Sequence, residues 1–180
     1  MGTHPQFAES GNGAIELIHT PSRRLSVAQI TDELGVQHLQ GEWEGARLML
    51  RRMGRHVRGA FAGIPQPGLA HVVYNLPLLL ACDVLEQTLL KLRVQYGFKS
   101  KSSSLGHLLE GARTESDITF VVYPALNIAF NHRNAVAHDG ELLSPEQCLA
   151  DIAAIETQLM PWGVLRSDAP NMDSAINDRG

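Results

Sequence analysis

Helical spacing of apolar residues runs through most of the chain and restricts what it can fold into. From Val27, Ile30 and Leu34 through Trp43 to Val57, apolar side chains recur at intervals of three and four, as in an amphipathic helix. Alternation with a period of two, the pattern of a strand, is nearly absent. The sequence therefore predicts an all-α protein, a mostly antiparallel bundle of four or five helices.

Local signals predict the ends of these helices. Ser26 followed by Gln29 is typical of a capping box at the start of the first helix. Gly35, Gly41 and Gly45 weaken the helical pattern that follows and could mark a break.

The later helices have prolines within or near them. A second helix is expected over about 69–96, with Pro77 either kinking it or lying in its first turn. The run "SLGHLLEGA" predicts a helix of two turns. A long helix is then expected from Asp117 to about His138, with Pro124 as another candidate kink.

The last helix has the clearest start in the sequence. Asp139-Gly140 ends the preceding helix, because glycine favours the left-handed backbone of a helix C-terminus. Ser144, Pro145 and Gln147 then predict a capped helix that runs to about residue 161. The length of 180 residues predicts one domain. Its expected parts are an N-terminal arm (1–25), a helical domain (26–162) and a polar tail (163–180).

Charge and cysteine content restrict the class of protein. The net charge of −4 gives no overall attraction to nucleic acid, so any such contact needs a local basic patch. Cys82 and Cys148 lie in apolar helical patterns without zinc-ligand spacing, which predicts buried free thiols in a reducing cytoplasm. No signal peptide is recognised, and the longest apolar run, "LPLLLACDVL", is too short to span a bilayer. We therefore expect a cytoplasmic protein without a membrane partner.

The segment "FNHRNAVAHDG", residues 130–140, turns abruptly polar after an apolar run. Histidine and arginine are costly to remove from water, so His132, Arg133 and His138 must face solvent, a partner or a ligand. Asn134 and His138 are four positions apart and share one helix face. Arg133 and His138 are five apart, roughly 140° around an ideal α-helix. The long arginine side chain and the helix end still allow both groups to converge on one phosphate.

These two side chains suit phosphodiester chemistry. His138 lies near a predicted helix C-terminus, where the macrodipole favours an imidazolium. Histidine also changes its charge near neutral pH, as general acid–base catalysis requires. The permanently charged guanidinium of Arg133 suits the negative charge that develops on a phosphorane. The segment is therefore either a helix end with a polar cap or an active site that cleaves RNA, and we favour the second interpretation.

The run "RNAVAH", residues 133–138, resembles the R-x(4–6)-H pattern of the HEPN superfamily, with Asn134 as the polar residue that often follows the arginine. The context is similar too, because the run ends a long predicted helix and precedes a turn and a last helix. "SLGHLLEGA" looks like the short helix that many relatives carry before the motif helix. The resemblance covers roughly residues 70–162 and leaves the N-terminal stretch unexplained.

The resemblance implies a metal-independent endoribonuclease without a cofactor. Two Arg–His pairs of a homodimer would line one composite cleft. A ribose 2′-hydroxyl would attack the adjacent phosphate, leaving a 2′,3′-cyclic phosphate and a 5′-hydroxyl. His138 would move a proton, Arg133 would hold the phosphate, and Asn134 would orient the partner histidine or the RNA backbone. Family contexts are toxin–antitoxin pairs, anti-phage defence and CRISPR effectors, so an antitoxin or a defence-complex protein is an expected partner.

One departure and two other interpretations accompany this resemblance. In the toxin branch paired with a nucleotidyltransferase antitoxin, a tyrosine often stands two residues after the motif histidine as an acceptor for adenylylation. Gly140 stands there in this chain, which argues against that regulation. Arg133 and His138 could instead be basic residues that complement a helix C-terminus. They could also belong to a family member that only binds or dimerises, serving a partner protein or a nucleotide.

The stretch "RLMLRRMGRHVRG" is the most basic part of the chain. Arg47, Arg51, Arg55 and Arg58 fall on one side of a helix, at spacings of four, four and three. Arg51, Arg55 and Arg58 are candidate contacts for the RNA backbone. A solvated helix face and a surface for an acidic antitoxin are the alternatives.

Two further histidines accompany the motif. His132 is a candidate RNA-binding residue, although a solvated neighbour of the motif is the simpler interpretation. His107 could approach the motif across the bundle or pack on a loop. A metal site formed by His107, His132 and His138 is disfavoured, because the last two are poorly spaced for ligands on one helix. No metal is therefore expected.

Overall fold

The computed structural model describes residues 28–60 and 67–166, with side chains placed for 28–52 and 73–166. Every regular element in these ranges is helical, which confirms the all-α class. The elements are α1 (Glu33–Ala60), α2 (Pro67–Tyr96), α3 (Leu105–Glu115), α4 (Tyr123–Asn134), the π-helical turn η1 (Ala135–Asp139) and α5 (Pro145–Leu159).

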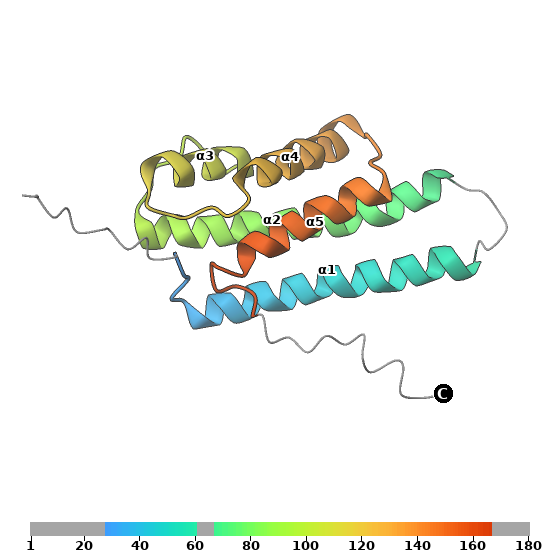
Figure 1. The fold of residues 1–180 in the computed structure, drawn as a ribbon, viewed down its shortest axis with the longest axis horizontal. Coiled ribbons are helices and arrows are strands. Elements are labelled where there is room, and N and C mark those ends of the chain that lie inside the picture. The colour runs from blue at the N-terminus through green and yellow to red at the C-terminus, as the bar shows by residue number, and fades with distance from the viewer. Residues whose placement is uncertain (1–27, 61–66, 167–180) are drawn as a thin grey trace, which may run out of the picture.

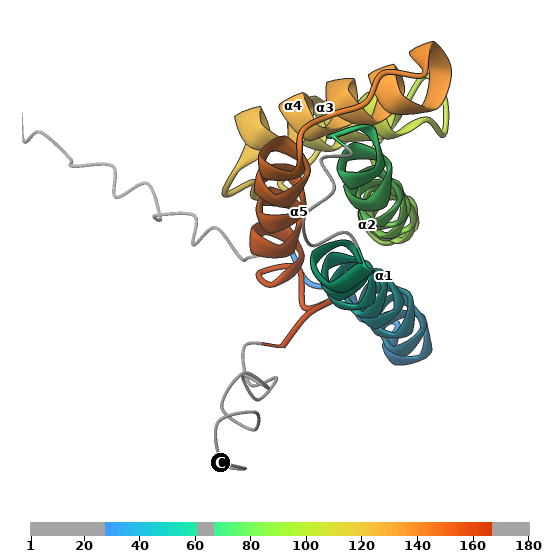
Figure 2. The same cartoon turned by 90° about the vertical axis from the view of Figure 1, so that its right-hand side faces the viewer.

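The helices form layers around α2. Figures 1 and 2 show α3 and α4 together on one side, α2 and α5 in the middle, and α1 on the opposite side. Because α2 packs against α1, α3, α4 and α5, much of its surface is apolar and buried. Its fully buried side chains recur at helical spacing: Leu78, Ala81, Cys82, Leu85, Leu89 and Leu92.

The remaining core side chains come from the helices around α2. Trp43 of α1 and Trp162 after α5 are fully buried. Cys82 and Cys148 are free and buried, which confirms the interpretation of both as buried thiols. One described segment, Val73–Tyr96, is long and apolar enough to cross a membrane by length and composition, a property that buried core helices share.

The first helix begins later than predicted. Gln29 lies in extended chain, and Ser26, the other half of the predicted capping box, lies outside the described residues. The backbone amide of Thr31 donates to Gln95 Oε1 (3.0 Å), and Gln95 Nε2 donates to the carbonyl of Gln29 (2.6 Å). These bonds to the end of α2 hold the segment outside a helix, so the local capping signal is overridden.

Asp32 begins α1 instead. Its Oδ1 accepts a hydrogen bond from the backbone amide of Gly35 (3.0 Å), as an N-cap aspartate does. Its Oδ2 lies 3.2 Å from Lys91 Nζ on α2. From there α1 continues through Gly41 and Gly45 without the break that these glycines suggested. The helix propensity of single glycines is therefore a weaker influence here than packing against α2.

The two prolines behave differently. Helix α2 begins at Pro67, so Pro77 lies inside the helix rather than at its start. Helix α4 begins at Tyr123, so Pro124 lies in its first turn, where a missing amide proton costs nothing. The prediction of a helix from Asp117 is therefore wrong.

Side chains from α5 and its C-terminal end explain the late start of α4. Buried Gln158 accepts from the amide of Val121 (2.8 Å) and donates to the carbonyl of Thr119 (3.3 Å). Trp162 Nε1 donates to the same carbonyl at 3.2 Å. With its backbone groups satisfied this way, the segment before α4 packs without being helical.

The predicted start of the last helix is confirmed. Ser144 Oγ accepts from the amide of Gln147, and the Gln147 side chain accepts in return from the amide of Ser144. Pro145 occupies the first turn of α5. The short helix is also present as α3, and it extends to Glu115 rather than ending after two turns.

Candidate functional site

The residues of "RNAVAH" lie where α4 ends and its winding changes. Arg133 and Asn134 are the last residues of α4, and His138 lies in the π-helical turn η1. The amides of Gly140 and Glu141 both donate to the carbonyl of Ala135, which closes this wide turn. Gly140 has a φ of 68°, the left-handed conformation expected of a glycine that ends a helix.

The wide turn changes the angle between Arg133 and His138. A π turn takes one more residue than an α turn, so each residue advances by a smaller rotation. His138 therefore lies closer to the side of Arg133 than the roughly 140° of an ideal α-helix predicts. Single π turns occur frequently at functional sites.

Arg133 is held by two neighbours. Its Nη1 donates to Asn134 Oδ1 at 3.2 Å, and its Nη2 lies 4.0 Å from Glu86 Oε2 on α2. Asn134 thus orients the motif arginine of its own chain. The Arg133 side chain is 33% exposed, so the guanidinium is paired but still reaches solvent.

Burial of Glu86 raises the pKa of its carboxyl, while the positive charge of Arg133 lowers it. Burial likewise raises the pKa of the Cys82 thiol to about 12, against a smaller opposing effect of Arg133. Cys82 is therefore a neutral thiol near pH 7 and no candidate nucleophile.

His138 is exposed, in contrast to Arg133. Within the described part of the chain, no hydrogen bond or ion pair engages its ring. An imidazole in this state can meet a substrate without first giving up a partner.

His132 makes the shortest polar contact of the site. Its Nδ1 lies 2.7 Å from Oδ2 of Asp151 on α5. The Asp151 side chain is only 6% exposed, and the His132 side chain is 27% exposed. Burial raises the pKa of the Asp151 carboxyl, while the hydrogen bond from His132 lowers it.

Sequence reasoning missed the role of Asp151. The apolar spacing of the run "DIAAIETQL" indicates only a core-facing side of a helix, and it leaves the aspartate unexplained. A carboxylate at a buried position needs a partner, which is the signal that could have revealed the pair. His132 was assigned to RNA binding, a role that stays a prediction beside its observed contact with Asp151.

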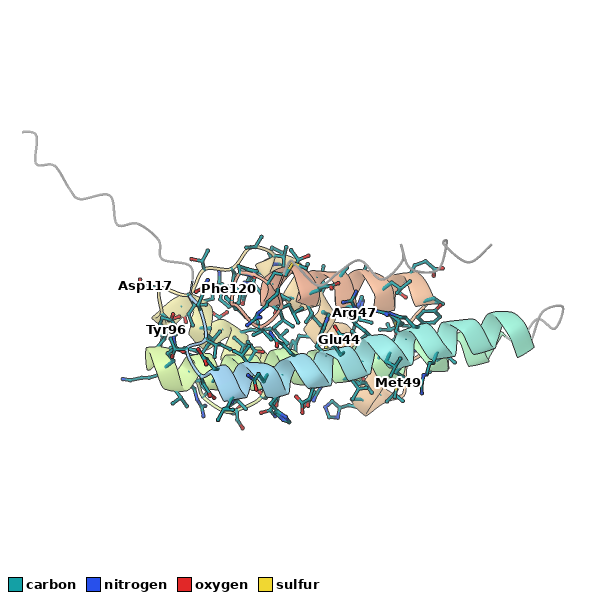
Figure 3. All side chains as sticks on the ribbon, turned by 90° about the horizontal axis from the view of Figure 1, so that it is seen from below. Glu44, Arg47, Met49, Tyr96, Asp117 and Phe120 are labelled. Atoms are coloured by element: carbon teal, nitrogen blue, oxygen red, sulfur yellow. The ribbon has the colours of Figure 1, made fainter. Side chains whose placement is uncertain are left out.

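The basic stretch of α1 is only partly free. Arg47 Nη1 lies 3.5 Å from Glu44 Oε1 and 4.0 Å from Glu156 Oε1 on α5. Figure 3 shows Glu44 and Arg47 together on α1. Arg51 is exposed, and the predicted contact of this residue with RNA remains a prediction. Arg55 and Arg58 lie in the last turns of α1, where side chains are outside the described residues.

His107 is bound to serines in the loop before α3. Its Nδ1 lies 2.8 Å from Ser102 Oγ and 2.9 Å from Ser104 Oγ. Across residues 28–52 and 73–166, no group of three or more His, Cys, Asp or Glu side chains is placed to hold a metal ion. The histidines of the site thus have separate surroundings: serines for His107, a carboxylate for His132 and solvent for His138.

Comparison of the chain with protein-family models, with curated proteins and with solved structures gives no match. The hypothesis of a HEPN domain therefore depends on the residues of the motif and on the all-α fold.

Proposed function

We propose that this protein is a metal-independent endoribonuclease with a HEPN-like helical bundle, which cleaves RNA by attack of a 2′-hydroxyl on the adjacent phosphate. The observation that carries the proposal is the placement of Arg133 and His138 at one helix end. Arg133 ends α4 and His138 lies in the π-helical turn η1 that follows it, and both side chains reach solvent.

The chemistry follows from these two groups. Arg133 binds a non-bridging oxygen of the scissile phosphate and stabilises the extra negative charge of the pentacoordinate state. The 2′-oxygen loses its proton and bonds to phosphorus, and the bond from phosphorus to the 5′-oxygen breaks. His138 exchanges a proton with one of these oxygens. The products are a 2′,3′-cyclic phosphate and a 5′-hydroxyl.

One chain contributes a single Arg133–His138 pair, and the proposed enzyme is a homodimer with two pairs in one cleft. Exposed apolar side chains on and just before α4 support this. Val121, just before α4, and Ile128 of α4 are 60% and 52% exposed. Exposed apolar side chains beside a polar site are suited to burial between two copies.

The biological setting belongs to the same proposal. A ribonuclease that is active on cellular RNA needs restraint, so an antitoxin or a defence-complex protein is the proposed partner in the cytoplasm. The exposed Arg51 on α1 is available to such an acidic partner or to RNA.

A non-catalytic binding or dimerisation module is the second candidate. The contact between Arg133 and Glu86 favours it, because a guanidinium that already faces a carboxylate is partly neutralised. Glu86→Gln separates the candidates. In a ribonuclease this change leaves Arg133 free for phosphate and lowers the KM for RNA. In a non-catalytic module neither form cleaves.

Purified protein tests the proposal with single-stranded RNA in excess chelator. We expect cleavage that ends in cyclic phosphates, and a loss of at least about 100-fold in rate for Arg133→Ala and for His138→Ala. Both variants should keep the helical circular dichroism of the parent. His38→Ala on α1 is the matched control. If both motif variants cleave as fast as the parent protein, the proposal fails.

A further inference from the structure

The end of α4 is anchored on two sides by consecutive residues. His132 contacts Asp151 of α5 at 2.7 Å, while Arg133 faces Glu86 of α2 at 4.0 Å. The two residues thus contact different helices, α5 and α2, which lie beneath α4 (Figure 2). This arrangement fixes the rotation of the helix end that leads into η1.

Asp151 fixes the His132 ring as well as the helix. An ionised carboxylate can only accept hydrogen bonds, so His132 Nδ1 carries the proton that it donates to Asp151. In the neutral ring the lone pair is then on Nε2, which points away from the buried carboxylate. No hydrogen bond to Nε2 is found among residues 28–52 and 73–166, and the side chain is 27% exposed.

Cleavage by a 2′-hydroxyl needs two proton transfers. One group takes the proton of the attacking 2′-hydroxyl, and another gives a proton to the departing 5′-oxygen. His138 can serve in one of these roles. Arg133 can serve in neither, because a guanidinium does not lose its proton in proteins.

We propose that His132 is a catalytic residue of the ribonuclease, the general base that Asp151 orients, with His138 as the general acid. The inference rests on the proposed ribonuclease function and adds a residue to it. Nε2 of His132 takes the 2′-hydroxyl proton, and the 2′-oxygen bonds to phosphorus. The bond to the 5′-oxygen breaks as that oxygen takes a proton from the His138 imidazolium. One proton is taken and one is given, so the step is balanced.

The ionisable groups around the pair come from three elements. Besides Asp151 and His132 they are Cys148 of α5, Asp83, Glu86 and Cys82 of α2, and Arg133 of α4. Burial keeps the two thiols neutral by raising their pKa values. Asp151 is thus the carboxylate in direct contact with His132, and this contact holds the ring in place.

The chain offers a matched control for this pair. His38 Nε2 lies 3.2 Å from Glu42 Oε1 on α1, on the side of the bundle opposite α4. His38→Gln therefore repeats the chemistry of His132→Gln away from the proposed site. Glutamine keeps an amide donor that can still reach the carboxylate, so the His132 variant is expected to fold.

The experiment measures kcat/KM for a single-stranded oligoribonucleotide as a function of pH. The parent protein should give a bell-shaped profile, with an acidic limb from His132 and a basic limb from His138. His132→Gln should lose about 100-fold or more in rate and should also lose the acidic limb. Asp151→Asn should keep that limb, because the amide oxygen of asparagine can still accept from Nδ1 and hold the ring in place. His38→Gln should change neither the rate nor the profile.

Other outcomes separate the two proposals. An inactive parent protein, or activity that survives Arg133→Ala and His138→Ala, contradicts the ribonuclease itself. Activity that depends on Arg133 and His138 but keeps its rate and acidic limb in His132→Gln overturns the general base alone. If His132→Gln is slow but its pH profile keeps both limbs, His132 has only a structural role, and the proposal of a general base is overturned. If this variant is too slow for a profile, added imidazole decides: it should restore cleavage by His132→Gly, and failure to do so overturns the inference.

Discussion

The described residues contain two histidine–carboxylate pairs that differ in almost every physical respect. His38 and Glu42 are one turn apart on α1, with side chains 69% and 35% exposed and 3.2 Å between their nearest atoms. His132 and Asp151 come from two helices and are separated by 2.7 Å. Their side chains are mostly buried. The first pair is made by helical periodicity alone, and the second is made by the fold.

This difference determines how much each pair contributes to the stability of the fold. Water screens an exposed pair, so its contribution to stability is small. A buried carboxylate has lost its hydration, and removing its partner leaves that loss uncompensated. The fold therefore tolerates changes at the first pair and depends on the second.

His132→Ala should have the largest effect on stability. It leaves Asp151 buried with one acceptor unsatisfied, for which a loss of about 3 kcal/mol in the free energy of unfolding is expected. Urea denaturation followed by circular dichroism measures it. A loss below about 1 kcal/mol would show that the pair contributes no more than an exposed one.

A double variant distinguishes the pair from its packing. His132→Leu combined with Asp151→Leu removes both polar partners, so no buried charge remains. Its stability should return to within about 1 kcal/mol of the parent protein, because apolar replacement of a buried pair is often neutral. Cleavage of RNA should not return. If the double variant recovers both stability and RNA cleavage, His132 is not a catalytic residue.

The same contrast explains what the sequence could predict. The capping box of Ser144 and Gln147 was found because its partners are three residues apart. The all-α class and the position of α2 follow from apolar periodicity, which is also local. The polar run that contains Arg133 was found as an interruption of that periodicity. Features that depend on neighbouring residues were thus predictable.

Features that depend on distant residues were not. The start of α1 was predicted wrongly because Gln29 and Thr31 bond to Gln95 at the far end of α2. The contact of His132 with Asp151 joins two helices across a turn, and no periodicity reports it. The π turn before Gly140 is likewise absent from an ideal-helix analysis of the motif. The polar segment was therefore recognisable in the sequence, whereas the contacts of its residues required the fold, and its role as a site stays a prediction.

The pH dependence of stability sharpens the comparison with a smaller effect. Burial raises the pKa of the Asp151 carboxyl in the folded protein above its ordinary value. A raised pKa contributes stability that is fully present below the unfolded value and is lost as pH rises through the folded value. The free energy of unfolding of the parent protein, relative to Asp151→Asn, should therefore fall as pH rises from about 3 to about 7.

Urea denaturation of both proteins at several pH values measures this difference. Glu42→Gln is the control, since Glu42 belongs to the exposed pair. The opposite outcome is a free energy of unfolding of the parent protein, relative to Asp151→Asn, that rises with pH. In that case the hydrogen bond from His132 lowers the pKa of the carboxyl more than burial raises it. That result would reverse the order of the two influences on the carboxyl.

The smallest effect is expected at the exposed pair. His38→Ala removes an imidazole that attracts Glu42 only when protonated, so the free energy of unfolding at pH 7 should change by less than about 0.5 kcal/mol. Any change in the free energy of unfolding at about pH 6 should shrink in about 1 M salt. The Debye length is then about 3 Å, and exposed charges farther apart than this are largely screened. The effect of His132→Ala should persist in the same salt. If both variants respond to salt alike, solvent screens the two pairs equally, and burial is not what separates them.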